Sequence, residues 1–317
     1  MLVNGKWEHD RPATQSLDNG GRFVRQVSTF RNWVTPDGAP GPTGVGGFPA
    51  TPHRYHLYVA LNCPWACRTL IFRKLKKLED IISVSIAIPQ FTEQGYSFGA
   101  YPGSIPDPLY TIHYIHELYT RADPHYTGRA TVPVLWDKAR GTMVNNESAD
   151  IIRMLNRAFD AFGDASMDFY PEELRPEIDA LNERIYEGLN NGVYRAGFAA
   201  SQDAYDEAVT AVFACLDELE QRLEGHPYLL GERITETDWR AFVTLIRFDI
   251  AYHGLFKCNV RRLIDYPNLS AYLRRLYDVP GVADTVDFHH IKRTYYSIPR
   301  VNPTGIVPKG PTRIFAA

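Results

Sequence analysis

One cysteine at a strand-to-helix junction is the residue of this sequence best placed to act as a nucleophile. Residues 55–68 read YHLYVALNCPWACR, in which an apolar, strand-like run ends at Cys63 and a helical pattern follows. The first backbone amides of a helix have no partner within it and carry partial positive charge, which favours the reactive thiolate. Pro64 suits the first helical turn because its missing N–H and fixed φ are harmless there. We therefore interpret Cys63 as a reactive thiol rather than a buried structural cysteine.

The other cysteines, Cys67, Cys215 and Cys258, carry weaker signals. Cys67 lies one helical turn after Cys63 and could face the same side, but the two do not form a CxxC pair. A small buried helix residue is the favoured interpretation of Cys67, and a disulfide with Cys63 stays open. If no second cysteine resolves oxidised Cys63, an external thiol must do so. The pattern therefore points to a thiol cosubstrate.

Two further motifs could bind a small ligand through backbone groups. GRATVPVLWD places Val132 and Pro133 at a strand start, where proline survives only at an edge or in a special turn. A cis bond between them would expose the Val132 amide and carbonyl to an extended ligand, and a plain edge-strand proline is the alternative. NNESAD puts Glu147 and Ser148 at a helix start, where free amides and a hydroxyl can bind a carboxylate. Taken alone, the motif is equally typical of a helix cap.

Metal and nucleotide signatures are weak. His113 and His116 in IHYIHELY share a face at helical spacing, but no third ligand accompanies them, so a packed or solvated pair is favoured. His289 and His290 precede a basic, aromatic stretch and suit a structural or a pocket role. GPTGVGG comes before the first strand and is followed by no helix, which makes it a linker and not a phosphate loop. We predict no metal cofactor.

Composition indicates a cytoplasmic protein that binds small molecules or other proteins. The 317 residues exceed a single domain of about 150, so two domains are expected. A hydrophobic content of 44% and a formal net charge of -3 give no electrostatic attraction to nucleic acid or anionic lipid. Neither a signal peptide nor an apolar run of membrane-spanning length is recognisable.

The first part of the chain predicts an α/β domain behind an extension. Residues 1–50 are polar and end in a Gly- and Pro-rich stretch, which predicts an extension without regular structure. In residues 51–160, YHLYVAL and IISVSIAI read as strands around a helix over residues 65–75, and the short crossover favours parallel pairing. After an irregular stretch over residues 89–128, VPVLWD and TMVNN read as strands and ESADIIRMLNRAF as a helix. The order is therefore βαβ followed by ββα.

The second part predicts an all-α domain over residues 170–290 and a tail over residues 291–317. Its long segments carry apolar residues at i, i+3 and i+4, the spacing typical of a helical bundle. Thr235 and Asp238 predict an N-cap, with Ile234 as the apolar neighbour before it. The helix that starts there should form the core of the bundle.

This arrangement resembles the cytosolic glutathione transferases. NCPWA, TVPVLWD, NNES, RFDIAYHGLFKCN, HHIKRTYY and NPTGIVPKGP resemble more closely one branch, the glutathionyl-hydroquinone reductases or Xi-class glutathione transferases. The similarity extends from about residue 32 to residue 311. It implies a thioredoxin-like N-terminal domain, a helical-bundle C-terminal domain, glutathione as cosubstrate, and a homodimer.

The resemblance also implies roles for individual residues. Cys63 would be the nucleophile, and Tyr194, Tyr252 and Tyr295 would line the acceptor pocket and contact the hydroquinone hydroxyls. Without the resemblance each tyrosine is equally a core aromatic, and the pattern cannot tell Tyr295 from Tyr296. The residues implied to hold glutathione are Tyr96, Arg129, Val132, Glu147 and Ser148, with Arg129 reaching the glycyl carboxylate. The family commonly has tryptophan where EQGYSFG has tyrosine, which could alter the affinity for glutathione.

The implied reaction is the glutathione-dependent reduction of a glutathionyl-hydroquinone. The Cys63 thiolate would attack the sulfur of the conjugate and release the hydroquinone, and a second glutathione would resolve the Cys63–glutathione disulfide to give oxidised glutathione. A carbon leaving group is poorer than a thiolate, so the tyrosine hydroxyls would assist by proton transfer. Two alternatives stay open. An Omega-like thiol transferase or dehydroascorbate reductase needs the cysteine but not the tyrosines, and a non-catalytic binding module of the same fold needs neither.

Overall fold

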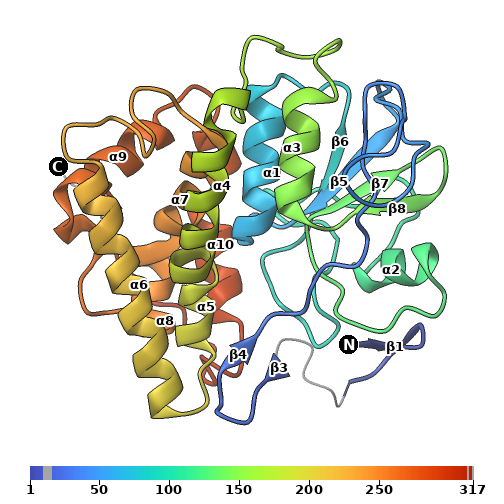
Figure 1. Ribbon diagram of the computed structural model, residues 1–317. Coiled ribbons are helices and arrows are strands. Elements are labelled where there is room, and N and C mark those ends of the chain that lie inside the picture. Colours follow the sequence, from blue (N-terminus) through green and yellow to red (C-terminus); the bar gives the residue numbers. More distant parts are fainter. Residues whose placement is uncertain (10–15, 313, 316–317) are drawn as a thin grey trace. The chain divides into compact units, whose positions relative to one another are not determined.

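The structure is a computed structural model that describes residues 1–9, 16–312 and 314–315. The chain divides into two compact units, whose elements are labelled in Figure 1. The first unit contains Gln26–Asp168, Asp284–His290 and the N-terminus. The second contains Phe169–Ala283, a short segment that ends at Arg25, and the chain from Ile291 onward.

A four-stranded mixed sheet forms the centre of the first unit (Figure 1). Its strands are β5 (Tyr55–Val59), β6 (Ser83–Ile86), β7 (Val134–Asp137) and β8 (Thr142–Asn145), in the order β6-β5-β7-β8. β5 pairs parallel with β6 and antiparallel with β7, and β7 pairs antiparallel with β8. The predicted parallel pairing and the βαβ-ββα order are confirmed.

Two helices, α1 (Pro64–Leu75) and α3 (Ser148–Arg157), pack side by side in this unit (Figure 1). All five residues of β5 are buried, as expected for a central strand whose two faces are covered. β5 and β8 run in the same direction because each is antiparallel to β7. The helix that follows each of these strands therefore begins at the same edge of the sheet.

The segment over residues 89–128 differs from the prediction that it is irregular. It contains α2 (His116–Ala122), which packs against β8. The helix begins at His116, so His113 precedes it and the two histidines do not share a helical face. A helix of only two turns next to glycine- and proline-rich stretches gives too few periodic positions to be recognised.

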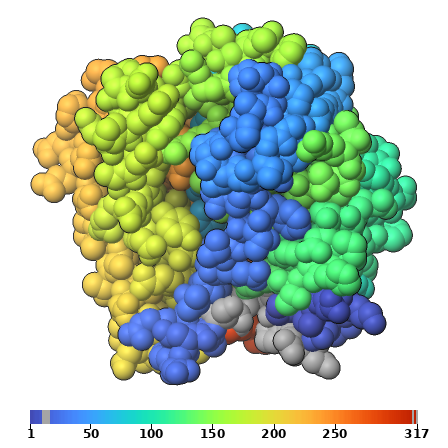
Figure 2. Space-filling view, turned by 45° about the vertical axis from the view of Figure 1, so that its right-hand side comes forward, coloured from blue at the N-terminus to red at the C-terminus, as the bar shows by residue number. Residues whose placement is uncertain are grey.

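The first fifty residues contain more regular structure than their composition predicts. Two short antiparallel hairpins are formed by β1 (Leu2–Val3) with β2 (Lys6–Trp7) and by β3 (Ser16–Leu17) with β4 (Phe23–Val24). Beyond them, the chain over residues 26–50 lies on the surface of the first unit (Figure 2). There the Asn32 amide donates to the Val144 carbonyl at 3.0 Å, which fastens this segment to β8.

Apart from the β3–β4 hairpin, the regular structure described in the second unit is helical. Its helices are α4 (Arg175–Ile185), α5 (Gly192–Gly197), α6 (Gln202–Arg222), α7 (Glu236–Arg247), α8 (His253–Leu255), α9 (Pro267–Tyr277) and the last residues of α10 (Phe288–Tyr296). Single π-helical turns cover Tyr186–Asn190 and Phe248–Tyr252. The predicted all-α character of this part of the chain is confirmed.

α7 is the buried central helix of the second unit, as its capping motif predicts. It begins directly after Thr235, whose amide donates to the Asp238 carboxylate at 2.7 Å. The same carboxylate accepts hydrogen bonds from the Leu229 amide at 3.0 Å and the Tyr272 hydroxyl at 2.9 Å. Nearly every side chain of α7 is buried. Across the residues that the structure describes, no helix is long and apolar enough to cross a membrane.

Candidate active site

Cys63 caps the N-terminus of α1. Its backbone is extended, with φ at -74° and ψ at 119°, and Pro64 occupies the first helical position. Cys63 is 5% exposed, and its Sγ donates to the Val132 carbonyl oxygen at 3.5 Å. The local sequence explains this placement, because proline can open a helix but cannot continue the strand before it. The predicted junction position is confirmed.

Val132 lies just before β7, and its bond to Pro133 is cis, as the sequence suggested. The Val132 amide donates to no described backbone or side-chain group. An extended peptide could therefore pair with Val132 beside the Cys63 thiol. Arg129 is close in sequence, and its backbone is fixed by the Gln26 side chain at 3.0 Å and the Tyr126 hydroxyl at 3.0 Å.

Glu147 and Ser148 open α3 at the same edge of the sheet. The Glu147 carboxylate caps the helix by accepting the Ala149 amide at 3.1 Å, and its second oxygen accepts the Ser28 hydroxyl at 3.0 Å. The Ser148 side chain is 2% exposed, and its Oγ has no hydrogen-bond partner among the described residues. A buried, unpaired hydroxyl at a helix N-terminus is a favourable position for a carboxylate ligand.

Tyr119 connects these two candidate binding segments, and the sequence gives no sign of it. Its hydroxyl donates to the Thr131 carbonyl at 2.9 Å and accepts the Thr131 amide at 3.1 Å and the Asn146 side chain at 3.1 Å. Burial raises the pKa of this hydroxyl, so it stays protonated. Tyr119 thus holds Thr131, which precedes Val132, at a fixed distance from Asn146, which precedes Glu147. Only the tertiary structure reveals this role, since α2 itself was not predicted.

Tyr96 lies beside the cysteine loop. Its hydroxyl accepts a hydrogen bond from the Asn62 side chain at 3.2 Å, and Asn62 directly precedes Cys63. Its ring packs edge-on against Phe91, with the ring centres 5.2 Å apart. The first unit therefore brings together Cys63 and Val132 by direct contact, and Tyr96 through Asn62.

The three predicted pocket tyrosines meet in the second unit. The Tyr194 and Tyr295 hydroxyl oxygens lie 2.6 Å apart, and those of Tyr252 and Tyr295 lie 2.8 Å apart. Phe256 packs against all three rings. Tyr252 and Tyr295 are buried, whereas Tyr194 is half-buried and forms the exposed end of the hydroxyl chain. We call Tyr194, Tyr252 and Tyr295 the tyrosine cluster.

The electrostatic environment keeps the inner hydroxyls of this cluster protonated. Burial raises the pKa of Tyr252 and of Tyr295 well above the usual value of 10, and the nearby Tyr194 adds to the effect. The guanidinium of Arg247, which is also fully buried, acts in the opposite direction. At neutral pH the cluster is therefore a hydrogen-bonded chain that can donate a proton from its exposed end.

The structure also distinguishes the role of Tyr295 from that of Tyr296, which the sequence pattern does not. Tyr296 is half-buried, and its carbonyl accepts a hydrogen bond from the Asn302 side chain at 2.6 Å. The hydrogen bonds described within the tyrosine cluster join Tyr194 to Tyr295 and Tyr252 to Tyr295, and do not include the Tyr296 hydroxyl. Tyr295 is thus the tyrosine of α10 that belongs to the cluster.

The remaining cysteines lie outside these groups. The Cys67 thiol donates to the Thr285 carbonyl at 3.6 Å, and Cys67 is fully buried. Burial raises the pKa of Cys215 to about 11 and that of Cys258 to about 12, which makes both unreactive as nucleophiles at neutral pH. The small-buried-residue interpretation of Cys67 agrees with its position.

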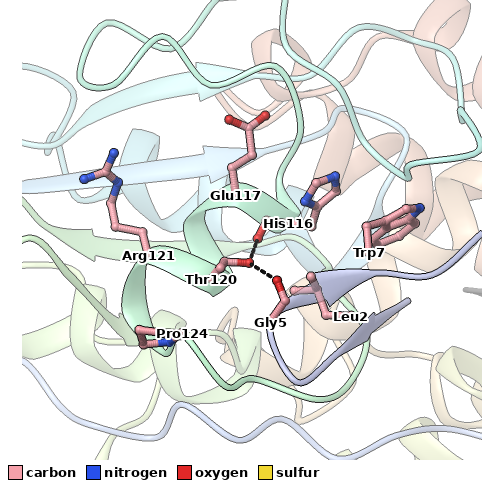
Figure 3. A pocket seen from close by; sticks show the side chains of 8 residues that line it. All are labelled: Leu2, Gly5, Trp7, His116, Glu117, Thr120, Arg121 and Pro124. Atoms are coloured by element: carbon pink, nitrogen blue, oxygen red, sulfur yellow. Dashed lines mark hydrogen bonds between the residues drawn. The ribbon is translucent and has the colours of Figure 1, made fainter.

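His116, a weak candidate metal ligand in the sequence, packs against neighbouring side chains. His116 stacks on the Trp7 ring, with centroids 4.6 Å apart, and its Nε2 lies 3.0 Å from the Gln94 side-chain oxygen. Both rings lie beside a shallow surface pocket of about 510 Å³ in the first unit (Figure 3). None of the predicted site residues is among its described lining. No group of three metal-ligating side chains occurs in the part of the chain that is described.

Comparison with known proteins identifies both halves of the chain. Residues 62–158 match the model "Glutathione S-transferase, N-terminal domain", and residues 202–275 match "Glutathione S-transferase, C-terminal domain". The glutathionyl-hydroquinone reductase YqjG of Escherichia coli K12 is 54% identical over 98% of this chain and 95% of its own length. The glutathionyl-hydroquinone reductase PcpF of Sphingobium chlorophenolicum is 49% identical over 99% and 96%.

Solved structures agree with these sequence matches. The glutathione-bound structure of YqjG superposes with a TM-score of 0.91 at 52% identity, covering 99% of this chain and 96% of that one. The glutathione transferase Xi of Phanerochaete chrysosporium superposes with a TM-score of 0.90 at 46% identity, covering 95% and 96%. The predicted fold class, a thioredoxin-like domain followed by a helical-bundle domain, is confirmed. With near-complete coverage at such identities, the chain belongs to the Xi class of the glutathione transferases.

Proposed function

We propose that this protein reduces glutathionyl-hydroquinones to hydroquinones at the expense of glutathione. The observation that carries the proposal is the Cys63 thiol, which sits at the N-terminus of α1 beside the Val132 carbonyl in a chain so similar to YqjG. The product set is a free hydroquinone and oxidised glutathione. A non-catalytic role has no comparable support, because Cys63 is present and lies at the N-terminus of α1.

Glutathione is held through its backbone and its two carboxylates. The unpaired amide of Val132 pairs with the peptide next to the glutathione thiol, which brings that sulfur to Cys63. The Ser148 hydroxyl and the start of α3 receive one carboxylate, and the Glu147 carboxylate faces the ammonium group beside it. Arg129 reaches the glycyl carboxylate, and the Tyr96 hydroxyl closes the side of the site next to Asn62.

The chemical steps balance with these groups. A hydroxyl group of the conjugate loses its proton while the ring carbon that bears sulfur takes one up, so the conjugate becomes its keto tautomer with no net change in charge. The Cys63 thiolate then attacks the glutathione sulfur, an S–S bond forms, and the C–S bond breaks. The electron pair of the broken bond restores the aromatic ring and leaves negative charge on the phenolic oxygen, which the tyrosine cluster neutralises by donating a proton. A second glutathione thiolate attacks the mixed disulfide, releases oxidised glutathione and regenerates Cys63.

Turnover of a synthetic glutathionyl-hydroquinone tests the proposal directly. We expect stoichiometric release of hydroquinone and oxidised glutathione, measured by chromatography with glutathione in excess. An Omega-like enzyme would reduce dehydroascorbate or a mixed disulfide and leave the thioether intact. Turnover of those substrates alone would replace the proposal with that alternative.

The reactivity of Cys63 provides a first prediction. Burial and the Val132 carbonyl favour the neutral thiol, whereas the N-terminus of α1 favours the thiolate. We expect the helix terminus to prevail, so that alkylation by iodoacetamide reaches its plateau at a lower pH than for an ordinary thiol, which has a pKa of about 8.5. Mass spectrometry of the Cys63 peptide across pH 5–10 measures this. A profile identical to that of free glutathione would show that the helix does not activate the thiol.

The hydroxyl of Ser148 provides a second prediction. Replacing Ser148 with Ala removes a hydrogen bond to a charged ligand, which is worth about 1.5–3 kcal/mol, so the KM for glutathione should rise about 10- to 100-fold. The kcat should change little, because the contact is equally present in the ground and transition states. Steady-state kinetics with varied glutathione measures both constants. An unchanged KM would mean that the carboxylate binds elsewhere.

We further propose that the chain acts in the cytoplasm as a homodimer. We also propose that residues 51–160 and 170–290 are its folded domains, with residues 1–50 as an extension and residues 291–317 as a tail. The family-model matches over residues 62–158 and 202–275 fall within the two proposed folded domains and support the second statement. Sedimentation velocity of the purified chain decides the oligomeric state.

A further inference from the structure

Arg25 contacts the tyrosine cluster from a part of the chain that the sequence showed only as an extension. It follows β4 and belongs to the second unit. Its guanidinium carbon lies 4.8 Å from the centre of the Tyr194 ring and 5.4 Å from that of Phe23. Its Nε donates to the Asn191 side-chain oxygen at 2.8 Å. Since Asn191 is buried at the start of α5, it fixes where the guanidinium sits over the ring.

This contact is specific to one arginine of the hairpin. Arg22, three residues earlier, is exposed and pairs with the Glu207 carboxylate at 2.8 Å. Arg25 is half-buried and faces aromatic rings instead. A surface ion pair such as that of Arg22 contributes little, whereas a partly desolvated guanidinium over an aromatic face contributes more.

We propose that Arg25 is a positioning residue for the reaction: it orients Tyr194 at the exposed end of the tyrosine cluster and stabilises the negative charge that the cluster carries after it donates a proton. This inference rests on the proposed reduction of glutathionyl-hydroquinones and adds to it a residue outside the predicted site.

The environment of the cluster explains why such a cation is needed. Burial opposes ionisation of Tyr252 and Tyr295, and each proton given to the departing hydroquinone leaves negative charge among buried rings. Arg247 is the buried cation at the inner side of the cluster. Arg25 is the cation on the outer tyrosine, whose hydroxyl is the half-buried end of the chain. A positive charge there lowers the free energy of the ionised cluster in the transition state.

Two substitutions of Arg25 separate its charge from its shape. Arg25→Met keeps an unbranched apolar stem over the ring and removes the charge, whereas Arg25→Lys keeps the charge. Arg22→Met is the matched control on the same hairpin. We expect Arg25→Met to lower kcat for a glutathionyl-hydroquinone about tenfold, and to leave kcat for a simple glutathione mixed disulfide within about twofold. Arg25→Lys should recover most of the loss, and Arg22→Met should match the wild type on both substrates.

The pH dependence gives a readout that a purely structural role would not move. Activity that needs a protonated cluster falls at high pH, and removal of a nearby cation makes the cluster harder to ionise. The alkaline fall in kcat should therefore occur at higher pH in Arg25→Met than in the wild type, and return toward the wild-type position in Arg25→Lys. Equal losses of kcat on both substrates in Arg25→Met would overturn the inference. So would an alkaline fall in kcat that occurs at the same pH in Arg25→Met as in the wild type.

A measurement without turnover keeps this inference distinct from the proposed function. With 3-fluorotyrosine at position 194, the ¹⁹F resonance reports ionisation of that residue directly. Its titration should shift to higher pH in Arg25→Met and not in Arg22→Met. If the wild type fails to cleave the conjugate while this titration shifts, the proposed function is wrong and the electrostatic role of Arg25 stands. If the conjugate is cleaved and the titration does not shift, Arg25 has no such role.

Discussion

Replacing Cys63 with Ser should remove reductase activity and leave the fold intact. A serine hydroxyl is slightly smaller than the thiol and fits the same buried position, but it is hardly ionised at neutral pH and is a poor nucleophile toward sulfur. We expect kcat for a glutathionyl-hydroquinone to fall by about 10³-fold or more. An unchanged thermal unfolding midpoint would show that the loss is chemical. Residual activity near that of the wild type would refute the assignment of the nucleophile.

Cys67→Ser is the matched control for this experiment. Cys67 is buried on the same helix, and its thiol contacts the Thr285 carbonyl, away from the Val132 carbonyl that Cys63 contacts. We expect wild-type kinetics. Mass spectrometry adds a direct test, because wild-type protein treated with the conjugate but without free glutathione should gain one glutathionyl group on Cys63. A strong loss of activity in Cys67→Ser, or a disulfide between the two cysteines, would support a two-cysteine mechanism instead.

Local patterns were sufficient to predict the elements that carry the thiol and the residues proposed to bind glutathione. The cysteine-proline pair marks the start of α1, and the Glu147 side chain caps α3, because both positions depend on residues adjacent in sequence. The capping motif at Thr235 marks the start of α7 for the same reason. The parallel pairing of β5 and β6 follows from a short crossover. These features needed no knowledge of the tertiary fold.

The sequence patterns do not predict contacts between segments that are distant along the chain. Tyr119 joins Thr131 to Asn146 from a helix too short to be recognised, and Arg25 reaches Tyr194 from a stretch with no periodic pattern. The meeting of the three tyrosine hydroxyls depends on the packing of three helical segments. Before the structure, only the family resemblance distinguished those tyrosines from ordinary core aromatics.

Replacing Tyr252 or Tyr295 with Phe should impair cleavage of the carbon–sulfur bond and spare reduction of a simple disulfide. Each change keeps the packed ring and removes one hydroxyl from the chain of 2.6 Å and 2.8 Å contacts. The hydroquinone leaves as a carbon group that requires a proton, whereas the thiolate of a glutathione mixed disulfide leaves without help. We expect kcat for the conjugate to fall by about 10²-fold or more, and kcat for the mixed disulfide to change less than about threefold.

Tyr296→Phe provides the comparison within the same helix. This tyrosine adjoins Tyr295 in sequence but its hydroxyl lies outside the cluster, so its loss should leave both activities near wild type. The two substrates share the Cys63 thiolate and the glutathione site, so a defect in either of those would lower both rates together. Equal losses on both substrates in Tyr252→Phe and Tyr295→Phe would therefore assign the hydroxyls to structure or glutathione binding. The Omega-like thiol transferase would then be the better description of this enzyme.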